Sequence, residues 1–213
     1  MTVVEFFFDI ISPYSRLQYE LLMRKVPHWK SMQLKLTPVS IRAIFEGSSN
    51  PSPALNPVKR AYLLRDLEMV HQYHDIPFAI PNDFMKIAIE IGSLKLQHFL
   101  AAIQSEIDDE TFKRLVGEYF RKFFDPNNPI NVFLEDQFKQ VAIDMKIDRN
   151  LIEKILSRLD SEEIKAKLEE NNRIALNLGG FGLPITLVHC DPPQWVFGSD
   201  RMHLLAHILH ESI

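Results

Sequence analysis

The residues with the clearest chemical potential form one short run, Ser12-Pro13-Tyr14-Ser15. A residue before proline is kept in the extended conformation of a helix N-cap, and the proline itself suits the first helical position. The order therefore predicts that Ser12 caps a helix. Its hydroxyl would lie beside free backbone N–H groups and the positive end of the helix dipole, where an anion is favoured. The plainer interpretation is an ordinary cap that stabilises a helix by about 1 kcal/mol.

Two later segments can also bind a ligand through their backbones. In the run GLPIT at residues 182–186, Pro184 can form a cis turn that leaves the backbone of Leu183 free for an extended peptide. A proline on an edge strand gives the same pattern. In the run GSDRM at residues 198–202, a helix N-terminus can take a carboxylate on its amides while Asp200 holds an ammonium group. A simple helix cap is again the alternative.

The patterns around Ser12 predict the strands and the helix that position it. Residues 3–8 are a β-branched and aromatic run of strand length that stops at Asp9. After Ser12, leucines recur at helical spacing until Pro27. Residues 33–39 then alternate polar and apolar side chains, which is typical of a strand. A strand, a helix and a second strand at this spacing predict a βαβ unit with parallel strands.

Residues 56–178 show helical periodicity almost throughout. Asn56-Pro57 predicts a cap followed by a proline at the first helical position, and Gly179-Gly180 marks the end of the last helix. Asp160 with Glu163 is the capping box expected for that last helix. The other helices are predicted at residues 93–107, 111–124, 135–145, 149–158 and 161–178.

Strand patterns return at residues 183–188 and 194–197, and the Asp191-Pro192-Pro193 connection between them predicts a hairpin. Gly198-Ser199-Asp200 is expected to cap a final helix. The predicted order is βαβ, a long helical stretch, then ββα. We therefore expect an α/β fold in which residues 1–55 and 179–213 form one domain and residues 56–178 an all-helical domain inserted into it.

Composition and charge exclude several function classes. The 213 residues are 46% hydrophobic and 24% charged, which is enough for a folded core and excludes a disordered chain. A net charge of −4 gives no general basic surface for nucleic acid. A single cysteine, Cys190, excludes an internal disulfide and suits a reducing compartment. We expect no membrane span, because no apolar run approaches the ~20 residues it needs, and no glycine-rich phosphate loop occurs.

Other side chains are weaker candidates for chemistry. Three histidines can share one helix face as metal ligands, but no glutamate base accompanies them and imidazoles near a helix C-terminus also favour its dipole. We therefore expect no metal there, and expect Cys190 to be a small filler. Four phenylalanines of the helical segment are expected to fill its core, with some lining a pocket. These residues are His203, His207 and His210, and Phe120, Phe123, Phe124 and Phe133.

A βαβ unit with a capped helix at its first turn, a helical insertion, an X-Pro strand and a ββα ending is the thioredoxin arrangement used by DsbA-type disulfide oxidoreductases. The sequence resembles more specifically the kappa-class glutathione transferases, from Val4 to nearly its last residue. The related glutathione-dependent 2-hydroxychromene-2-carboxylate isomerases share the same style of serine-proline motif. The matching segments are Phe8-Asp9, residues 12–15, the Pro38 stretch ending at Asn50, Asn56-Pro57 with Lys59, Tyr62 and Asp66-Leu67, residues 180–186 and residues 197–207.

The resemblance implies a glutathione site around the first turn. Ser12 stands in the place of the family's catalytic serine, whose hydroxyl hydrogen-bonds the sulfur of bound glutathione. Pro13 and Tyr14 are expected to line the same turn. Leu183, which precedes an expected cis Pro184, would pair its backbone with the cysteinyl unit.

Further contacts follow from the same resemblance. Ser199 and Asp200 are expected to hold the γ-glutamyl end of glutathione. Asn50 and Lys59 match other glutathione contacts, with Lys59 meeting the glycyl carboxylate. Arg16 stands where relatives often have tryptophan, so the pocket for the second substrate is not defined by the resemblance.

Serines at both Ser12 and Ser15 exclude disulfide exchange, which needs a low-pKa thiolate at the first position and a resolving cysteine at the second. We expect a glutathione transferase that acts on small hydrophobic electrophiles, as a homodimer, with glutathione as co-substrate and no further cofactor. The alternatives are the glutathione-dependent isomerase and a non-catalytic peptide binder that uses the Pro184 edge. The family implies mitochondria or peroxisomes. No targeting signal is evident, and residues 211–213 do not match the serine-lysine-leucine peroxisomal address.

Overall fold

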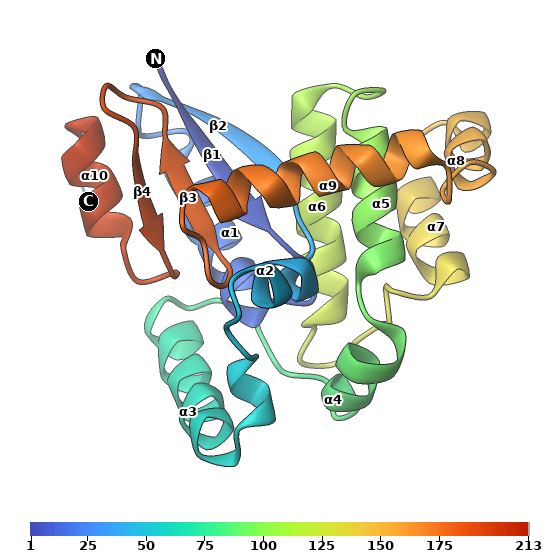
Figure 1. Ribbon diagram of the computed structural model, residues 1–213, viewed down its shortest axis with the longest axis horizontal. Coiled ribbons are helices and arrows are strands. Elements are labelled where there is room, and N and C mark those ends of the chain that lie inside the picture. Colours follow the sequence, from blue (N-terminus) through green and yellow to red (C-terminus); the bar gives the residue numbers. More distant parts are fainter. Residues whose placement is uncertain (213) are drawn as a thin grey trace.

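The computed structural model describes residues 1–212, so the last residue of the C-terminal tripeptide lies outside the described chain. One sheet has the strand order β2-β1-β3-β4 (Figure 1). Its strands are β1 (Thr2–Phe8), β2 (Met32–Pro38), β3 (Ile185–Val188) and β4 (Gln194–Phe197). β1 pairs in parallel with β2 and antiparallel with β3, and β3 pairs antiparallel with β4. The predicted parallel unit, the hairpin and the thioredoxin-like α/β fold are confirmed.

Helix α1 (Pro13–Lys25) joins β1 to β2, and α10 (Met202–Leu209) follows β4. Between β2 and β3 the described elements are all helical: α2 (Ile41–Gly47), η1 (Pro53–Leu55), α3 (Pro57–Tyr73), α4 (Phe84–Lys86), the π turn η2 (Ile87–Ile91), α5 (Leu94–Ile103), α6 (Asp109–Phe123), α7 (Glu135–Asp144), α8 (Arg149–Leu156) and α9 (Glu162–Asn177). The sequence patterns did not predict α2, η1, α4 or η2, and α5 ends four residues before its predicted end. None of the helices in residues 1–212 has the length and apolarity to cross a membrane.

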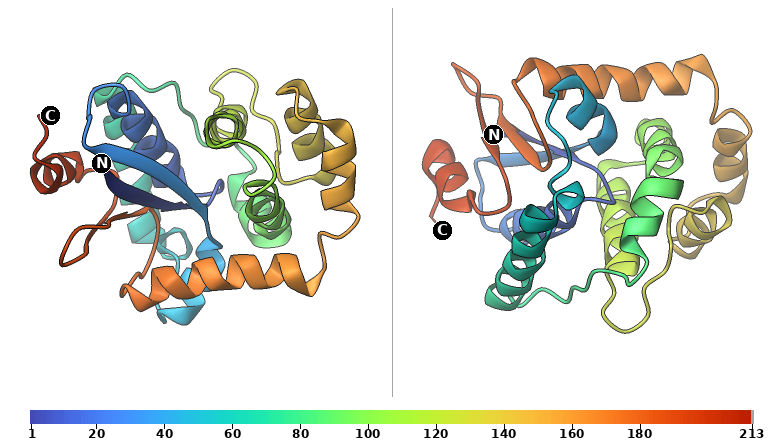
Figure 2. Two further views of the ribbon diagram at one scale, coloured as in Figure 1. Left: turned by 90° about the horizontal axis from the view of Figure 1, so that it is seen from above. Right: turned by 60° about the horizontal axis from the view of Figure 1, so that its bottom comes forward.

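Alternating side chains of β1 separate two hydrophobic cores. Phe6 and Phe8 point into the larger core, which continues through α1 into α6, whereas Phe7 packs on the other face with Ile44 of α2 and Ala175 of α9. Figure 2 shows α1 and α9 on opposite sides of the sheet. The C-terminal end of β1, which leads to Ser12, is therefore buried from both faces. The division into one domain of residues 1–55 and 179–213 and an inserted domain of residues 56–178 stays a prediction.

The helix ends test the capping predictions. Asn56 caps α3 as predicted, because its Oδ1 accepts hydrogen bonds from the N–H groups of Val58 and Lys59. Gly179 has a φ of 85° and ends α9, also as predicted. The predicted capping box at the start of α9 is wrong, because Ser161 is the N-cap and accepts from the N–H of Ile164 at 3.4 Å.

The four phenylalanines expected in the helical core are all buried there. Phe120, Phe123 and Phe124 are fully inaccessible to solvent, and Phe133 is 3% exposed. None of the four lines the cavity described below, so the expectation that some face a ligand pocket is wrong.

Candidate functional site

The first turn of α1 presents a hydroxyl group with an unused proton. Ser12 is the N-cap with φ −81° and ψ 115°, and its Oγ accepts a hydrogen bond from the N–H of Ser15 at 3.2 Å, as the sequence predicts. A serine hydroxyl has one proton to donate and two lone pairs. Within residues 1–212 the Ser12 proton has no acceptor, although the residue is only 2% exposed. Ser12 can therefore donate a hydrogen bond to an atom that enters from the adjoining cavity.

The backbone of the same turn supplies a second donor. Pro13 occupies the first helical position and has no N–H group, while the N–H of Ser15 is taken by Ser12. The helical hydrogen bonds begin with Arg16, whose N–H donates to the carbonyl of Ser12 at 3.1 Å. Among the described residues the N–H of Tyr14 thus has no acceptor, and it lies at the positive end of the helix dipole, where an anion is stabilised.

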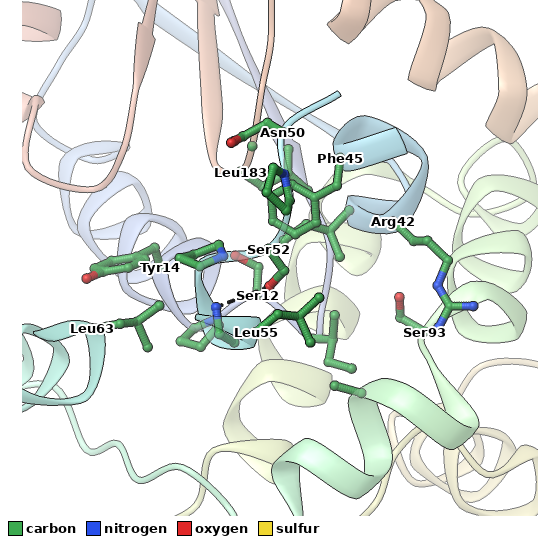
Figure 3. A pocket seen from close by; sticks show the side chains of 18 of the residues that line it. Ser12, Tyr14, Arg42, Phe45, Asn50, Ser52, Leu55, Leu63, Ser93 and Leu183 are labelled. Atoms are coloured by element: carbon green, nitrogen blue, oxygen red, sulfur yellow. Dashed lines mark hydrogen bonds between the residues drawn. The ribbon is translucent and has the colours of Figure 1, made fainter. Parts of the chain in front are cut away.

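A cavity of about 1240 Å³ opens over this turn (Figure 3). Its lining comes from the start of α1, from α2, from the loop and turn at residues 49–55, from α3, from residues 84–94 and from residues 181–183. The structure brings six of the predicted glutathione residues to this one cavity: Ser12, Pro13, Tyr14, Asn50, Lys59 and Leu183. Pro184, Ser199 and Asp200 are not among the lining residues. Ser15, the second serine of the motif, is fully buried and faces away from it.

Tyr14 is fixed as part of the cavity wall by a side chain that the sequence patterns did not single out. Its hydroxyl donates to Oδ2 of Asp66, in α3, at 2.5 Å. Burial, together with the hydrogen bond to Asp66 and its negative charge, raises the pKa of the Tyr14 hydroxyl far above its ordinary value. Tyr14 therefore stays protonated, and the hydrogen bond ties the start of α1 to α3.

Asp9 holds the backbone on which the site is built. Its fully buried carboxylate accepts from the N–H of Ile11 at 3.1 Å, from the N–H of Ile41 at 2.9 Å and from the hydroxyl of Ser93 at 2.7 Å. Burial raises the pKa of the Asp9 carboxyl to about 6, although the three hydrogen bonds partly oppose the shift. One side chain thus joins the end of β1 to the starts of α2 and α5. The sequence showed Asp9 only as the residue that ends a strand and as part of a segment that matches the family.

The peptide bond between Leu183 and Pro184 is cis, as predicted. Pro184 precedes β3, which lies between β1 and β4, so the alternative of an edge-strand proline is wrong. Leu183 lines the cavity, and in residues 1–212 no backbone-to-backbone hydrogen bond uses its N–H or C=O. Asn50 supports this segment, because its Nδ2 donates to the carbonyl oxygen of Phe181 at 2.7 Å. The backbone of Leu183 is therefore available to a ligand.

The remaining predicted residues lie at the margins of the cavity. Lys59 is exposed in the first turn of α3 and forms no ion pair with another described residue. Asp200 is exposed and pairs with Arg201 at 3.4 Å, whereas Ser199 is buried. The charge of Asp200 contributes, after burial, Asp66 and Tyr62, to the raised pKa of Tyr14. The predicted cap at residues 198–200 is wrong, because Arg201 is the N-cap of α10 and makes no side-chain cap bond.

The weaker candidates do not join this site. His203, His207 and His210 are exposed along and after α10, and none of them lines the cavity. Among residues 1–212, no group of three or more histidine, cysteine or acidic side chains is arranged to hold a metal ion. Cys190 follows β3, is partly buried and packs against the larger core.

The sequence and the fold are similar to those of several known proteins. Residues 3–210 match the model of the DSBA-like thioredoxin domain family. Human glutathione S-transferase kappa 1 is 35% identical over 210 residues, covering 98% of this chain and 91% of the relative. Glutathione S-transferase kappa 2 of Caenorhabditis elegans is 32% identical over 213 residues, covering 98% and 92%. A solved 2-hydroxychromene-2-carboxylate isomerase, 20% identical, superposes with a TM-score of 0.78 over 98% of this chain and 94% of its own.

Proposed function

The chain belongs to the DSBA-like thioredoxin domain family and, within it, to the kappa-class glutathione S-transferases, and on this premise we propose that it joins the sulfur of glutathione to small hydrophobic electrophiles. One observation carries the proposal. Ser12, whose hydroxyl proton has no acceptor among the described residues, lines a large and mainly apolar cavity next to the N–H of Tyr14. This arrangement favours a small soft anion such as a thiolate, and the serine cannot supply a sulfur of its own.

In the proposed complex the sulfur of glutathione lies at Ser12, between Pro13 and Tyr14. The cysteinyl unit pairs with the free backbone of Leu183, beside the cis Pro184. Two further pairs of residues complete the proposed contacts with the tripeptide. Asn50 and Lys59 make further contacts, with Lys59 on the glycyl carboxylate, and Ser199 and Asp200 hold the γ-glutamyl end.

The energies suffice to ionise the thiol. Lowering a thiol pKa from about 8.5 to about 6.5 requires roughly 2.7 kcal/mol of preference for the thiolate. A helix N-terminus contributes about 0.3 to 2 kcal/mol, and a hydrogen bond to a charged atom about 1.5 to 3 kcal/mol. In the reaction the thiol proton leaves to solvent and the sulfur forms a bond to the electrophilic carbon. The leaving group, such as chloride, departs with its bonding electrons.

Ionisation alone gives little acceleration. At pH 7.5 such a shift raises the thiolate fraction about tenfold, while a Brønsted slope of about 0.45, taken over from disulfide exchange, lowers its nucleophilicity nearly eightfold. Most of the rate therefore comes from holding the sulfur against the electrophile in a cavity that excludes water. The apolar lining supplied by residues 84–94 supports this division of roles.

Replacing Ser12 with alanine tests the proposal. We expect Ser12→Ala to raise the pKa seen in the pH profile of kcat/KM by about one to two units, because the thiolate loses a charge-assisted hydrogen bond. The rate with chlorodinitrobenzene and glutathione should fall about two- to sixfold at pH 6.5, because the greater nucleophilicity partly offsets the smaller thiolate fraction, and it should not fall at pH 9. Ser15→Ala is the matched control, because the Ser15 hydroxyl is buried, has no partner and does not line the cavity.

Other outcomes assign other functions. If calorimetry detects no binding of glutathione to the unmodified protein, the proposal fails. If glutathione binds but only isomerisation of a 2-hydroxychromene-2-carboxylate is catalysed, the protein is the isomerase. An equal loss of rate at pH 6.5 and pH 9 in Ser12→Ala would overturn the division between ionisation and positioning.

Assembly, compartment and domain organisation are proposals of the same kind. We propose a homodimer, which sedimentation of the purified protein tests directly. We propose mitochondria or peroxisomes as the compartment, to be tested by imaging of the tagged full chain. The inserted domain of residues 56–178 is tested by asking whether its unfolding separates from that of residues 1–55 and 179–213 in calorimetry.

A further inference from the structure

The cavity is lined by two cations, Lys59 and Arg42, and Arg42 also forms no ion pair with another described residue. Arg42 lies in the first turn of α2. Glu46, one turn further along α2, also lines the cavity without pairing to it. In Figure 3 the Arg42 side chain extends toward Ser93, on the opposite side of Ser12 from Tyr14 and Leu63. A side-chain carbon built on Gly92 would lie 3.9 Å from Nη2 of Arg42, so the guanidinium lies directly beside that backbone.

Apart from Ser93 and Glu46, the side chains that line the cavity near Arg42 are mostly apolar. Phe84, Ile89, Ile91 and Leu94 line it, and the last three of these side chains are 43% to 58% exposed. A guanidinium offers two parallel N–H groups that match a carboxylate, and it stays charged at every working pH. An apolar wall with one unpaired guanidinium therefore favours a ligand that has an apolar body and one anionic group.

The second cation of the lining is placed for a different ligand. Lys59 lies in α3, the helix that Asp66 ties to Tyr14, one turn before Leu63. Figure 3 shows Leu63 on the Tyr14 side of Ser12. In the proposed glutathione complex Lys59 meets the glycyl carboxylate. Arg42 lies on the opposite side of Ser12, and in the proposed complex the second substrate approaches the sulfur from that side.

We infer that the second substrate is a hydrophobic electrophile carrying a carboxylate, and that Arg42 binds this carboxylate and so determines specificity. The inference rests on the proposed transferase function, whose chemistry it leaves unchanged. Arg42 acts on the part of the substrate that does not react, and its contribution therefore appears in binding more than in the chemical step.

Two electrophiles that share one reacting centre and differ in charge test the inference. The probes are 4-chloro-3,5-dinitrobenzoate and its methyl ester, each reacted with glutathione, with rates divided by the uncatalysed rates. We expect Arg42→Gln to lower kcat/KM for the benzoate about tenfold, mainly through KM, and to change the ester by less than about twofold. Arg42→Lys should recover part of the benzoate rate, because it keeps the charge and loses the paired N–H geometry. The KM for glutathione should stay the same.

Arg65→Gln is the matched control, since Arg65 is exposed on α3, outside the cavity, and its loss changes the net charge equally. It should leave both electrophiles unaffected. Equal losses for benzoate and ester in Arg42→Gln would overturn the inference, as would a rise in the KM for glutathione, which would place a glutathione carboxylate at Arg42. Equal use of both electrophiles by the unmodified protein would overturn it while leaving the transferase intact. Turnover of neither electrophile would overturn the transferase proposal and this inference with it.

Discussion

The two walls of the cavity differ in how they are attached to the core. The wall around Ser12, here called the Ser12 wall (residues 9–14 and 40–41), is held by buried polar side chains from distant elements. Asp9 accepts from the backbone of Ile11 and Ile41, and Oδ1 of Asn172, in α9, accepts from the N–H of Ser40 at 2.8 Å. Gln97, in α5, donates to the carbonyls of Phe8 and Val39 at 3.0 and 2.7 Å.

The opposite wall, here called the acceptor wall (residues 83–94), has fewer such ties. Neither α4 nor η2 has a side-chain cap at its start, and η2 closes with the N–H of Gly92 donating to the carbonyl of Ile87, the long hydrogen bond of a π turn. Only at its end does this wall meet the Ser12 wall, through the bond from Ser93 to Asp9.

The difference suits the two tasks that the proposed reaction would assign to these walls. Attack by sulfur needs a donor held within a fraction of an ångström, which buried and fully paired hydrogen bonds provide. A wall that accepts varied hydrophobic bodies needs exposed apolar side chains on backbone with few ties, which is the composition of a locally soft segment. Changes in the Ser12 wall should therefore cost stability, and changes in the acceptor wall should alter substrate binding.

The largest contrast is expected between two aspartates. Asp9→Ala removes the acceptor of three buried donors, and we expect it to lower the free energy of unfolding by about 3 kcal/mol. Asp83→Ala, at the start of the acceptor wall, should cost less than about 0.5 kcal/mol, because Asp83 is exposed and makes no cap bond. Urea unfolding of both variants measures the difference. Similar losses in the two would show that Asp9 does not hold the Ser12 wall.

The same carboxylate should make stability depend on pH. The pKa of Asp9 is about 6 in the folded chain, above its ordinary 3.8, because burial disfavours its charge. The folded chain therefore binds this proton more tightly, so the contribution is complete below pH 3.8 and is lost as the pH rises through 6. The whole change is about 3 kcal/mol.

Asp9→Asn isolates this contribution, because the other titrating groups cancel when the two proteins are compared. The free energy of unfolding of the unmodified protein, minus that of Asp9→Asn, should fall between pH 4 and pH 7. A difference that does not vary with pH would mean that burial does not raise the pKa of Asp9 in the folded chain.

The two walls also differ in how well the sequence predicts them. Ser12 and Pro13 set their own cap and first helical turn through local rules, and the proline of the GLPIT run is cis as expected. The pairing of Tyr14 with Asp66, across 52 residues, and the three bonds of Asp9 depend on the finished packing, which no local pattern contains. The short α4 and the π turn have no cap signal, so the elements of the acceptor wall before residue 93 were missed.

A smaller effect is expected at Gly92, where the acceptor wall turns into α5. Its φ of 69° with ψ of −179° belongs to a region that is essentially restricted to glycine. We expect Gly92→Ala to lower the free energy of unfolding by about 1 to 2 kcal/mol through backbone strain, since an added carbon would meet only the Arg42 side chain at 3.9 Å. Gly92→Asn should not recover stability, because asparagine tolerates the left-handed helical region and not this one. A loss below about 0.5 kcal/mol would show that the turn relaxes freely.

The smallest effect on stability is expected for Ile89→Ala, and Ile11→Ala is the variant with which we compare it. Ile11 is 6% exposed in the Ser12 wall, so Ile11→Ala should cost about 2 to 4 kcal/mol through a cavity in the core. Ile89 is 58% exposed in the acceptor wall, so Ile89→Ala should cost less than about 0.5 kcal/mol. Its methyl groups should instead be covered by the second substrate, and their loss should raise the KM for an apolar electrophile about threefold while the KM for glutathione stays the same. Urea unfolding of both variants measures the loss of stability, and steady-state kinetics measure the change in KM. If Ile89→Ala destabilised the protein as much as Ile11→Ala, or left the KM for the electrophile unchanged, the acceptor wall would be part of the structural core and not a surface for the substrate.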